Sequence, residues 1–334
     1  MLETVWFLLW GILWAVYFMV GGFDLGTGVL APFIAKTDAE KQKVLGAIGP
    51  FWDGNEVWLI TAGGVTFAAF PAAYAALFSA FYTPLMIVLF ALIVRAISLE
   101  FRDRREGGRW RALCDTGVFV GSFLPCLLFG VAFANIFRGI PLDGEGVYRG
   151  NLLTLLNPYG LAGGLFFLAL FALHGAGWQV LKLDGAASER ARALTRLLWP
   201  LTTLLAVIFL LLSAFSTRLW QNYAAFPALF VVPLLAVIAI LSIRVFMARG
   251  RWGASFLASL ATILFAVLFG VIGLYPNLLP STLDPAFSIS IYNGASSHLT
   301  LRIMLAVALV FVPVVIIYQG WVYRLFWSSS SRTL

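Results

Sequence analysis

Residues Leu85–Val94 read LMIVLFALIV and residues Leu204–Leu212 read LLAVIFLLL, and neither run contains a polar side chain. The strands of a transmembrane β-barrel alternate apolar and polar residues, which these runs do not. Similar apolar blocks recur at a length of about 20 residues, which lets an α-helix cross the roughly 30 Å hydrocarbon layer of a bilayer. The runs therefore predict an all-α integral membrane protein that crosses the membrane many times.

The composition of the whole chain agrees with this class. Of its 334 residues, 61% are hydrophobic and only 11% are charged, whereas soluble domains carry roughly 25% charged residues. A soluble globular enzyme is therefore excluded. The two cysteines, Cys114 and Cys126, are too few and too far apart for a disulfide framework or a zinc site.

Hydropathy predicts about nine spanning helices, packed in bundles, in a single polytopic membrane domain that covers residues 1–334. The second and third nearly abut through Phe70–Pro71, so a re-entrant element there would change the count. A short segment near residues 37–50 begins like a helix cap, and we expect it to lie along the cytoplasmic interface. The two long loops near residues 138–158 and 276–300 give no sign of a folded domain outside the membrane. The predicted spans are residues 5–32, 54–76, 78–98, 116–137, 159–181, 198–217, 225–247, 253–275 and 302–326.

The positions of the basic residues predict the orientation. Eighteen Lys and Arg follow the odd-numbered helices, and four follow the even-numbered ones. Because cytoplasmic loops concentrate Lys and Arg, the N-terminus is expected outside and the C-terminus in the cytoplasm. The net charge of +7 is thereby explained by topology, and no nucleic-acid partner is expected.

Ionisable side chains at membrane depth are informative because each costs about 2.5 to 3.5 kcal/mol unless it is paired or hydrated. Asp53 and Glu56 are three residues apart and share a helix face, with Glu56 the deeper of the two. Asp24 approaches the same leaflet from the neighbouring helix. Three carboxylates that step inward from the cytoplasm are typical of a path for protons through intervening water.

Each acid has a structural alternative to be weighed against that function. Asp53 lies where a helix begins and would serve as its cap. Glu56 would instead pair with a nearby Lys or Arg. Asp24, between Phe23 and Leu25, has no such alternative and requires a partner inside the bundle.

The two histidines, His174 and His298, argue against a redox metal in this chain. A membrane protein that carries electrons between haems needs several axial ligands on facing helices. We therefore expect no metal site, and we expect His174 to be a hydrogen-bonded core residue.

Glycines four residues apart lie on one face of a helix and let another backbone approach closely. This spacing occurs three times inside predicted spans. We interpret it as helix packing within the chain. The pairs are Gly22 with Gly26, Gly117 with Gly121, and Gly160 with Gly164.

Two motifs carry a resemblance to a known family. Residues Gly22–Gly28 read GFDLGTG and residues Phe51–Leu59 read FWDGNEVWL. Together they resemble subunit II (CydB) of the cytochrome bd quinol oxidases. Further matches run in order along the chain, at Gly121–Phe123, Gly130–Phe133, Gly139–Pro141, Leu156–Leu161, Leu274–Pro276 and Ala295–Leu301.

The resemblance implies a subunit of a respiratory complex in a bacterial or archaeal cytoplasmic membrane. It implies that a haem-bearing subunit I (CydA-like) carries two b haems, haem d and the quinol-binding loop, and that subunit II holds no haem and supports assembly. The complex oxidises quinol, reduces dioxygen to water with protons drawn from the cytoplasm, and contributes to the proton motive force. Membrane lipid is an expected partner, and a small accessory subunit and a structural quinone are left open.

The resemblance also assigns roles to residues of the two motifs. It implies that Asp53 is the start of a proton uptake route and that Asp24 continues it, and Glu56 adds a further protonatable side chain to that route. Trp52, Asn55 and Trp58 support the motif, and no catalytic residue is expected in this chain alone. Some relatives have an acid where this chain has Gly21, and Gln where it has Glu56.

A proton-coupled secondary transporter or channel is the alternative function. Such a protein is expected to show inverted repeats and paired broken helices. The odd helix number and the absence of a visible repeat count against it.

Overall fold

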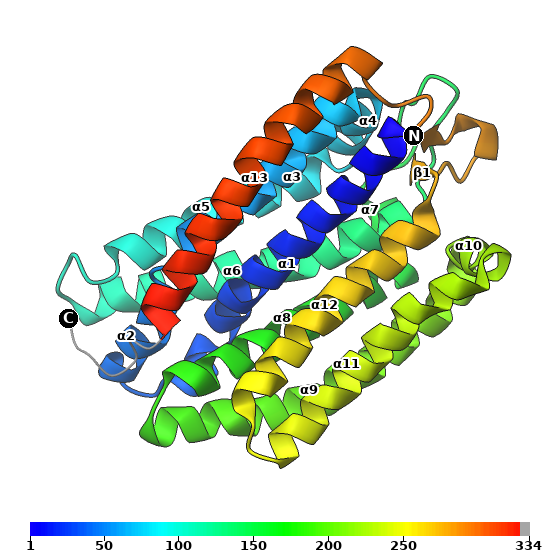
Figure 1. Ribbon diagram of the computed structural model, residues 1–334. Helices are drawn as coiled ribbons and strands as arrows, with labels where there is room; N and C mark the ends of the chain where they lie inside the picture. The colour runs from blue at the N-terminus through cyan, green and yellow to red at the C-terminus, as the bar shows by residue number, and fades with distance from the viewer. Residues whose placement is uncertain (328–334) are drawn as a thin grey trace.

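The computed structural model describes residues 1–327 and is a bundle of long helices (Figure 1). Its shorter elements are α2 (Asp38–Gly46), α4 (Pro71–Ala80), α7 (Leu152–Leu155), α10 (Trp220–Ala225), two 3-10 turns at Pro227–Phe230 and Pro285–Phe287, and strands β1 (Asn277–Leu279) and β2 (Ile289–Ser290). The long helices are α1 (Leu2–Ile34), α3 (Trp52–Ala69), α5 (Tyr82–Phe101), α6 (Gly108–Arg138), α8 (Pro158–Lys182), α9 (Gly185–Ser216), α11 (Val231–Ala248), α12 (Trp252–Leu274) and α13 (His298–Trp327).

Eight helices of the described chain are long and apolar enough to span a membrane. The predicted span at 54–76 differs, because its helix α3 is shorter and more polar and ends at Ala69. Pro71 has no backbone N–H and disfavours helical geometry in the residue before it, so a new helix, α4, begins there. The 18 residues of α3 still rise about 27 Å at 1.5 Å per residue, which is close to the thickness of the roughly 30 Å hydrocarbon layer.

The two ends of the bundle differ in character. One end, here called the hairpin end, holds Met1, β1 and β2; the other, the α2 end, holds α2 and the loops at residues 102–107, 183–184 and 249–251. Figure 1 shows that α13 ends at the opposite end from Met1, as an odd number of crossings requires. The loops that carry most of the basic residues gather at the α2 end, as the charge pattern predicted; Arg332 lies outside the described residues.

The loops at the hairpin end pack on each other, which the sequence did not predict. The Ile140 N–H donates to Pro280 O at 3.0 Å, and the Thr282 N–H donates to Ile140 O at 3.0 Å. Strands β1 and β2 pair antiparallel beside this contact. These bonds satisfy backbone groups that a long loop would otherwise leave to water.

Helix α8 lies at the centre of the bundle and is mostly buried, whereas α13 is mostly exposed. Edge-to-face contacts join Phe18 of α1 to Phe133 of α6 and Phe167 of α8, at centroid distances of 5.0 and 5.2 Å. Such pairs stabilise a core beyond the area they bury. The core that positions the site therefore lies between α1, α6 and α8.

The spaced glycines face other helices, as predicted. A Cβ on Gly26 would overlap the carbonyl oxygen of Phe171, and one on Gly175 would lie 2.5 Å from the backbone of Gly26. A Cβ on Gly121 would lie 2.5 Å from Ala91 O, and one on Gly164 would lie 2.8 Å from the Val131 side chain. The packing interpretation is confirmed at these contacts.

The segment near residues 37–50 forms α2, with a reciprocal cap at its start. The Glu40 N–H donates to Thr37 Oγ1 at 3.2 Å, and the Thr37 N–H donates to Glu40 Oε2 at 3.3 Å. This capping box satisfies two backbone donors that the helix leaves free. Val44 and Leu45 are buried beneath the helix, so α2 closes this end of the bundle.

Candidate functional site

The first two turns of α3 connect this helix to α1, α5 and α13. Asn55 is buried and donates its amide to Asp24 Oδ2 at 2.7 Å and to Val20 O at 3.1 Å, both on α1. Tyr323 of α13 donates its hydroxyl to Asn55 Oδ1 at 2.9 Å. Asn55, predicted only as a motif residue, is thus the bundle partner that Asp24 requires.

Glu56 faces α5 and accepts a hydrogen bond from Arg95 Nη1 at 2.8 Å. The Arg95 side chain is 1% exposed and the Glu56 side chain 25%, so the pair lies at the edge of the buried cluster. The Arg95 guanidinium also lies 6.0 Å from the Trp52 ring centroid. The alternative of an arginine partner for Glu56 is therefore confirmed, and Trp52 lines the same pair.

Gln319 on α13 binds the motif at two points. Trp58 Nε1 donates to Gln319 Oε1 at 2.7 Å, and Gln319 Nε2 donates to Gly54 O at 3.1 Å. Neither Gln319 nor Tyr323 was among the residues predicted from the sequence. The available signal was an amide inside an apolar span, a costly placement that usually marks a helix contact or a function.

Asp53 lies apart from this buried network. It is exposed in the first turn of α3, whose N-cap residue is Phe51 and which has no side-chain cap. The capping interpretation of Asp53 is therefore wrong. The three predicted acids form a burial series, in which Asp53 is exposed, Glu56 is half-buried and Asp24 is 2% exposed.

Several buried polar atoms of the cluster lack a hydrogen-bond partner among residues 1–327. They are Asp24 Oδ1 and the Arg95 Nε and Nη2 atoms. The charges of Arg95 and Glu56 both act on the Asp24 carboxylate, and the charge of Asp53 acts on Glu56. Buried groups of this kind are normally satisfied by protein or water, so the cluster is suited to bind water between its charges.

The two histidines lie in different parts of the molecule. His174 is fully buried, with Nδ1 2.7 Å from Ser259 Oγ and Nε2 3.0 Å from Met19 O. Its ring stacks on Phe256 with the ring centroids 4.5 Å apart. His298 Nε2 lies 3.1 Å from the Glu3 carboxylate at the hairpin end. Both ring nitrogens of His174 are engaged within the bundle, as expected of a core histidine.

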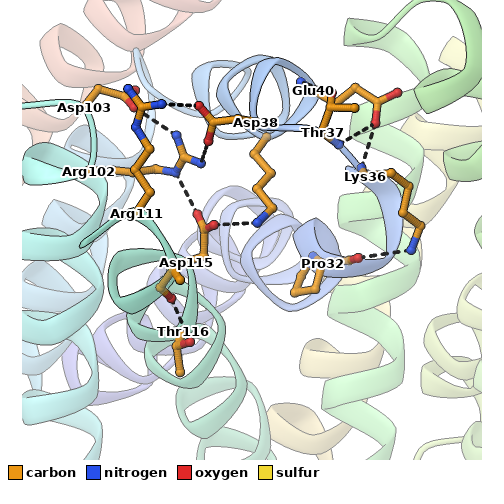
Figure 2. Close-up of polar contacts among 12 residues, drawn as sticks. Pro32, Lys36, Thr37, Asp38, Glu40, Arg102, Asp103, Arg111, Asp115 and Thr116 are labelled. Carbon is orange, nitrogen blue, oxygen red and sulfur yellow. Dashed lines mark hydrogen bonds and ion pairs between the residues drawn. The ribbon is translucent and has the colours of Figure 1, made fainter. Parts of the chain in front are cut away.

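A second charged cluster joins α2 to the α5–α6 loop (Figure 2). Arg102 is 2% exposed and bonds to Asp38 at 2.6 Å, Asp115 at 2.7 Å and Asp103 at 2.9 Å. Lys41 bonds to the other oxygen of Asp115 at 2.6 Å. Burial works against the charge of Arg102, but its bonds to Asp115 and Asp38 outweigh burial and raise its pKa. This cluster holds the α2 end together.

Acid is expected to loosen the α2 end. The hydrogen bond from Arg102 lowers the pKa of Asp38, and bonds from the Lys36 N–H and from Arg190 lower the pKa of Glu40. A carboxyl whose folded pKa is depressed stabilises the fold above its unfolded value of about 4 and loses that contribution as the pH falls. The midpoint of thermal unfolding should therefore drop between pH 6 and pH 3. Asp38→Asn should shrink that drop, whereas Glu106→Gln, at an exposed residue of the same end, should leave it unchanged.

The helix bundle and its buried carboxylate–amide cluster define a class, that of all-helical polytopic membrane proteins with an ionisable site between helices. The family model of cytochrome bd terminal oxidase subunit II matches residues 2–326, and the chain belongs to this family. The resemblance seen in the two motifs is confirmed, and the transporter alternative is no longer needed.

Individual relatives align with the chain over nearly their full length. The chain is 34% identical to the probable cytochrome oxidase subunit 2 of Haemophilus influenzae and to cytochrome bd-I ubiquinol oxidase subunit 2 of Escherichia coli, in each case over 96% of this chain and 93% of the relative. Its fold is similar to that of bd oxidase from Geobacillus thermodenitrificans, with a TM-score of 0.80 and 19% identity over 97% of this chain and 98% of that one. The chain is a subunit II of a cytochrome bd-type quinol oxidase, a respiratory membrane complex in which it partners with subunit I.

Proposed function

We propose that this chain holds no haem, supports the assembly of the haem-bearing subunit I, and lines a proton uptake route that begins at the α2 end. The proposal places the α2 end in the cytoplasm, because most basic loop residues lie there. The complex oxidises quinol and reduces dioxygen to water, and protons for that reduction pass Asp53, Glu56 and Asp24 in order.

The observation that carries the proposal is the buried Asp24 carboxylate with one oxygen bonded to Asn55 and the other unpartnered among the described residues. A carboxylate that is fully bonded to protein groups is a structural link. One with a free oxygen next to Arg95 and Glu56 is able to bind water and exchange a proton with it. The graded burial of Asp53, Glu56 and Asp24 supports an inward direction.

The geometry of α3 supports the supply of protons from the α2 end. Its first turn presents Asp53 to solvent, and one turn further Glu56 is held toward the bundle by Arg95. Asn55, between them in sequence, is fixed by Val20 O and Tyr323. These contacts thus hold Asp53, Asn55 and Glu56 of α3 in fixed positions relative to the buried Asp24.

The proposal is tested by Asp24→Asn in the assembled oxidase. The amide keeps the shape and the bond to Asn55 but cannot carry a proton, so oxygen consumption with excess quinol should fall about tenfold or more. The haem spectrum of the purified complex should be unchanged. Asp53→Asn should give a smaller loss, because water reaches the exposed site directly.

Glu145→Gln, at an exposed acid of the hairpin end, is the matched control and should leave oxygen consumption unchanged. Normal activity and a normal haem spectrum in Asp24→Asn would refute the proton route. Loss of haem in that variant would show that Asp24 is structural.

A further inference from the structure

The α2 end contains a cavity of about 630 Å³ between the last turn of α1, helix α2 and the first turns of α6. A water molecule occupies roughly 30 Å³ of liquid, and small-molecule sites measure roughly 300 to 1,000 Å³. The cavity is therefore the size of a ligand site. It lies away from the Asp24 cluster, and the proposed proton route does not use it.

The lining of the cavity is divided between charged and apolar groups. Lys36 and Lys41 provide two ammonium groups, and Asp115 provides one carboxylate. The apolar part includes Phe33, which is 53% exposed, and Val118 and Phe119 on α6. Because α1 and α6 are membrane-spanning helices that end here, the charged part lies where the headgroups of a bilayer lie.

The charges around the cavity leave a positive excess at Lys36. Asp115 accepts bonds from Lys41 and Arg102, and Asp38 accepts bonds from Arg102 and Arg111. Lys36 has no carboxylate within 4 Å among residues 1–327, and its Nζ lies 3.4 Å from Pro32 O. Figure 2 shows Lys36 and Asp115 on opposite sides of the α1 end that carries Pro32. Lys36 is thus an available cation at the cavity.

We infer that this cavity binds an anionic phospholipid, with the phosphodiester at Lys36 and the acyl chains along Phe33, Val118 and Phe119. A headgroup with a single negative charge balances the unpaired lysine. The aromatic and aliphatic wall excludes a free phosphate as the occupant, since such an ion would leave that wall in contact with water. Basic pockets between spanning helices suit lipid headgroups for the same electrostatic reason.

The test is to purify the whole oxidase in detergent, add phosphatidylglycerol or phosphatidylcholine with the same chains, and count retained lipid by native mass spectrometry. The wild-type complex should retain phosphatidylglycerol in preference to phosphatidylcholine. Lys36→Gln should weaken that retention about fivefold, the effect of one lysine near an anionic headgroup. Lys43→Gln, at an exposed lysine of α2 outside the cavity, should retain the lipid normally.

A second variant removes the space and keeps the charge. Thr116→Trp fills the cavity from an exposed position of α6 and should abolish retention, whereas Leu113→Trp, on the same helix outside the cavity, should not. Equal retention of both lipids, or retention in Lys36→Gln equal to wild type, would overturn the inference. Displacement of the lipid by millimolar inorganic phosphate would also overturn it, because the site would then be one for a free anion.

Discussion

Replacing Gly26 with valine should separate α1 from α8 and leave little intact oxidase in the membrane. The Cα of Gly26 lies against the backbone of α8, where a Cβ would overlap Phe171 O and lie 2.6 Å from the Phe171 carbonyl carbon. A Cβ built on Gly175 of α8 would likewise lie 2.5 Å from backbone atoms of Gly26 and Thr27. Backbone atoms cannot move aside as a side chain does, so the two helices must part.

The expected loss of intact oxidase is large because the contact between α1 and α8 lies in the centre of the bundle. Overpacking a core costs about 1 to 3 kcal/mol where side chains are able to shift, and this site offers no such relief. Parting α1 from α8 also separates Phe18 from Phe167 and displaces Asp24, which lies between Phe18 and Gly26 on α1. The yield of complex on size-exclusion chromatography, with its haem spectrum, measures the effect.

Two other glycines serve as comparisons for Gly26. Gly253 has no atom within 4 Å of its Cβ position, so Gly253→Ala should give a normal yield. At Gly22 the nearest atom, 3.0 Å away, belongs to the Phe171 side chain, so Gly22→Ala should have an intermediate effect. Normal assembly of Gly26→Val would show that α1 and α8 are not packed as described.

The sequence contains enough information to predict the spanning helices and the motif on α3. Apolar runs such as Leu85–Val94 can be recognised in the sequence without knowing which helices pack beside them. The break at Phe70–Pro71 was not predicted, since the expected span at 54–76 runs through it, although the effect of proline on its own chain is a local signal. The buried position of Asp24, by contrast, followed from the cost of a charge between Phe23 and Leu25.

The contacts that complete the site could not be read from the sequence. Gln319 and Tyr323 lie more than 260 residues from Trp58 and Asn55 in the chain. Nothing local specifies which face of α13 meets α3, since that depends on how all the helices pack. The same holds for Ile140 and Pro280, whose loops pair only because the bundle brings their ends together. Local patterns thus predict elements and costly residues, and tertiary packing decides their partners.

Arg95→Leu should destabilise the complex strongly, because it leaves the Glu56 carboxylate without its cation. Arg95 is 1% exposed and bonds to Glu56 at 2.8 Å. Removing one member of a buried ion pair typically costs about 3 to 5 kcal/mol, since the remaining charge stays desolvated. Thermal unfolding of the purified oxidase, followed by tryptophan fluorescence, should show a much lower midpoint.

The double variant Arg95→Leu with Glu56→Leu separates the structural role of the pair from its proposed function. Replacing both members of a buried pair by apolar side chains is often neutral for stability, so the midpoint should recover most of the loss. The difference between the double variant and the sum of the single ones gives the coupling energy of the pair. Oxygen consumption should nevertheless stay low, because the step between Asp53 and Asp24 is missing. Recovery of both stability and activity would instead show that the pair only holds α3 to α5, and that protons reach Asp24 without Glu56.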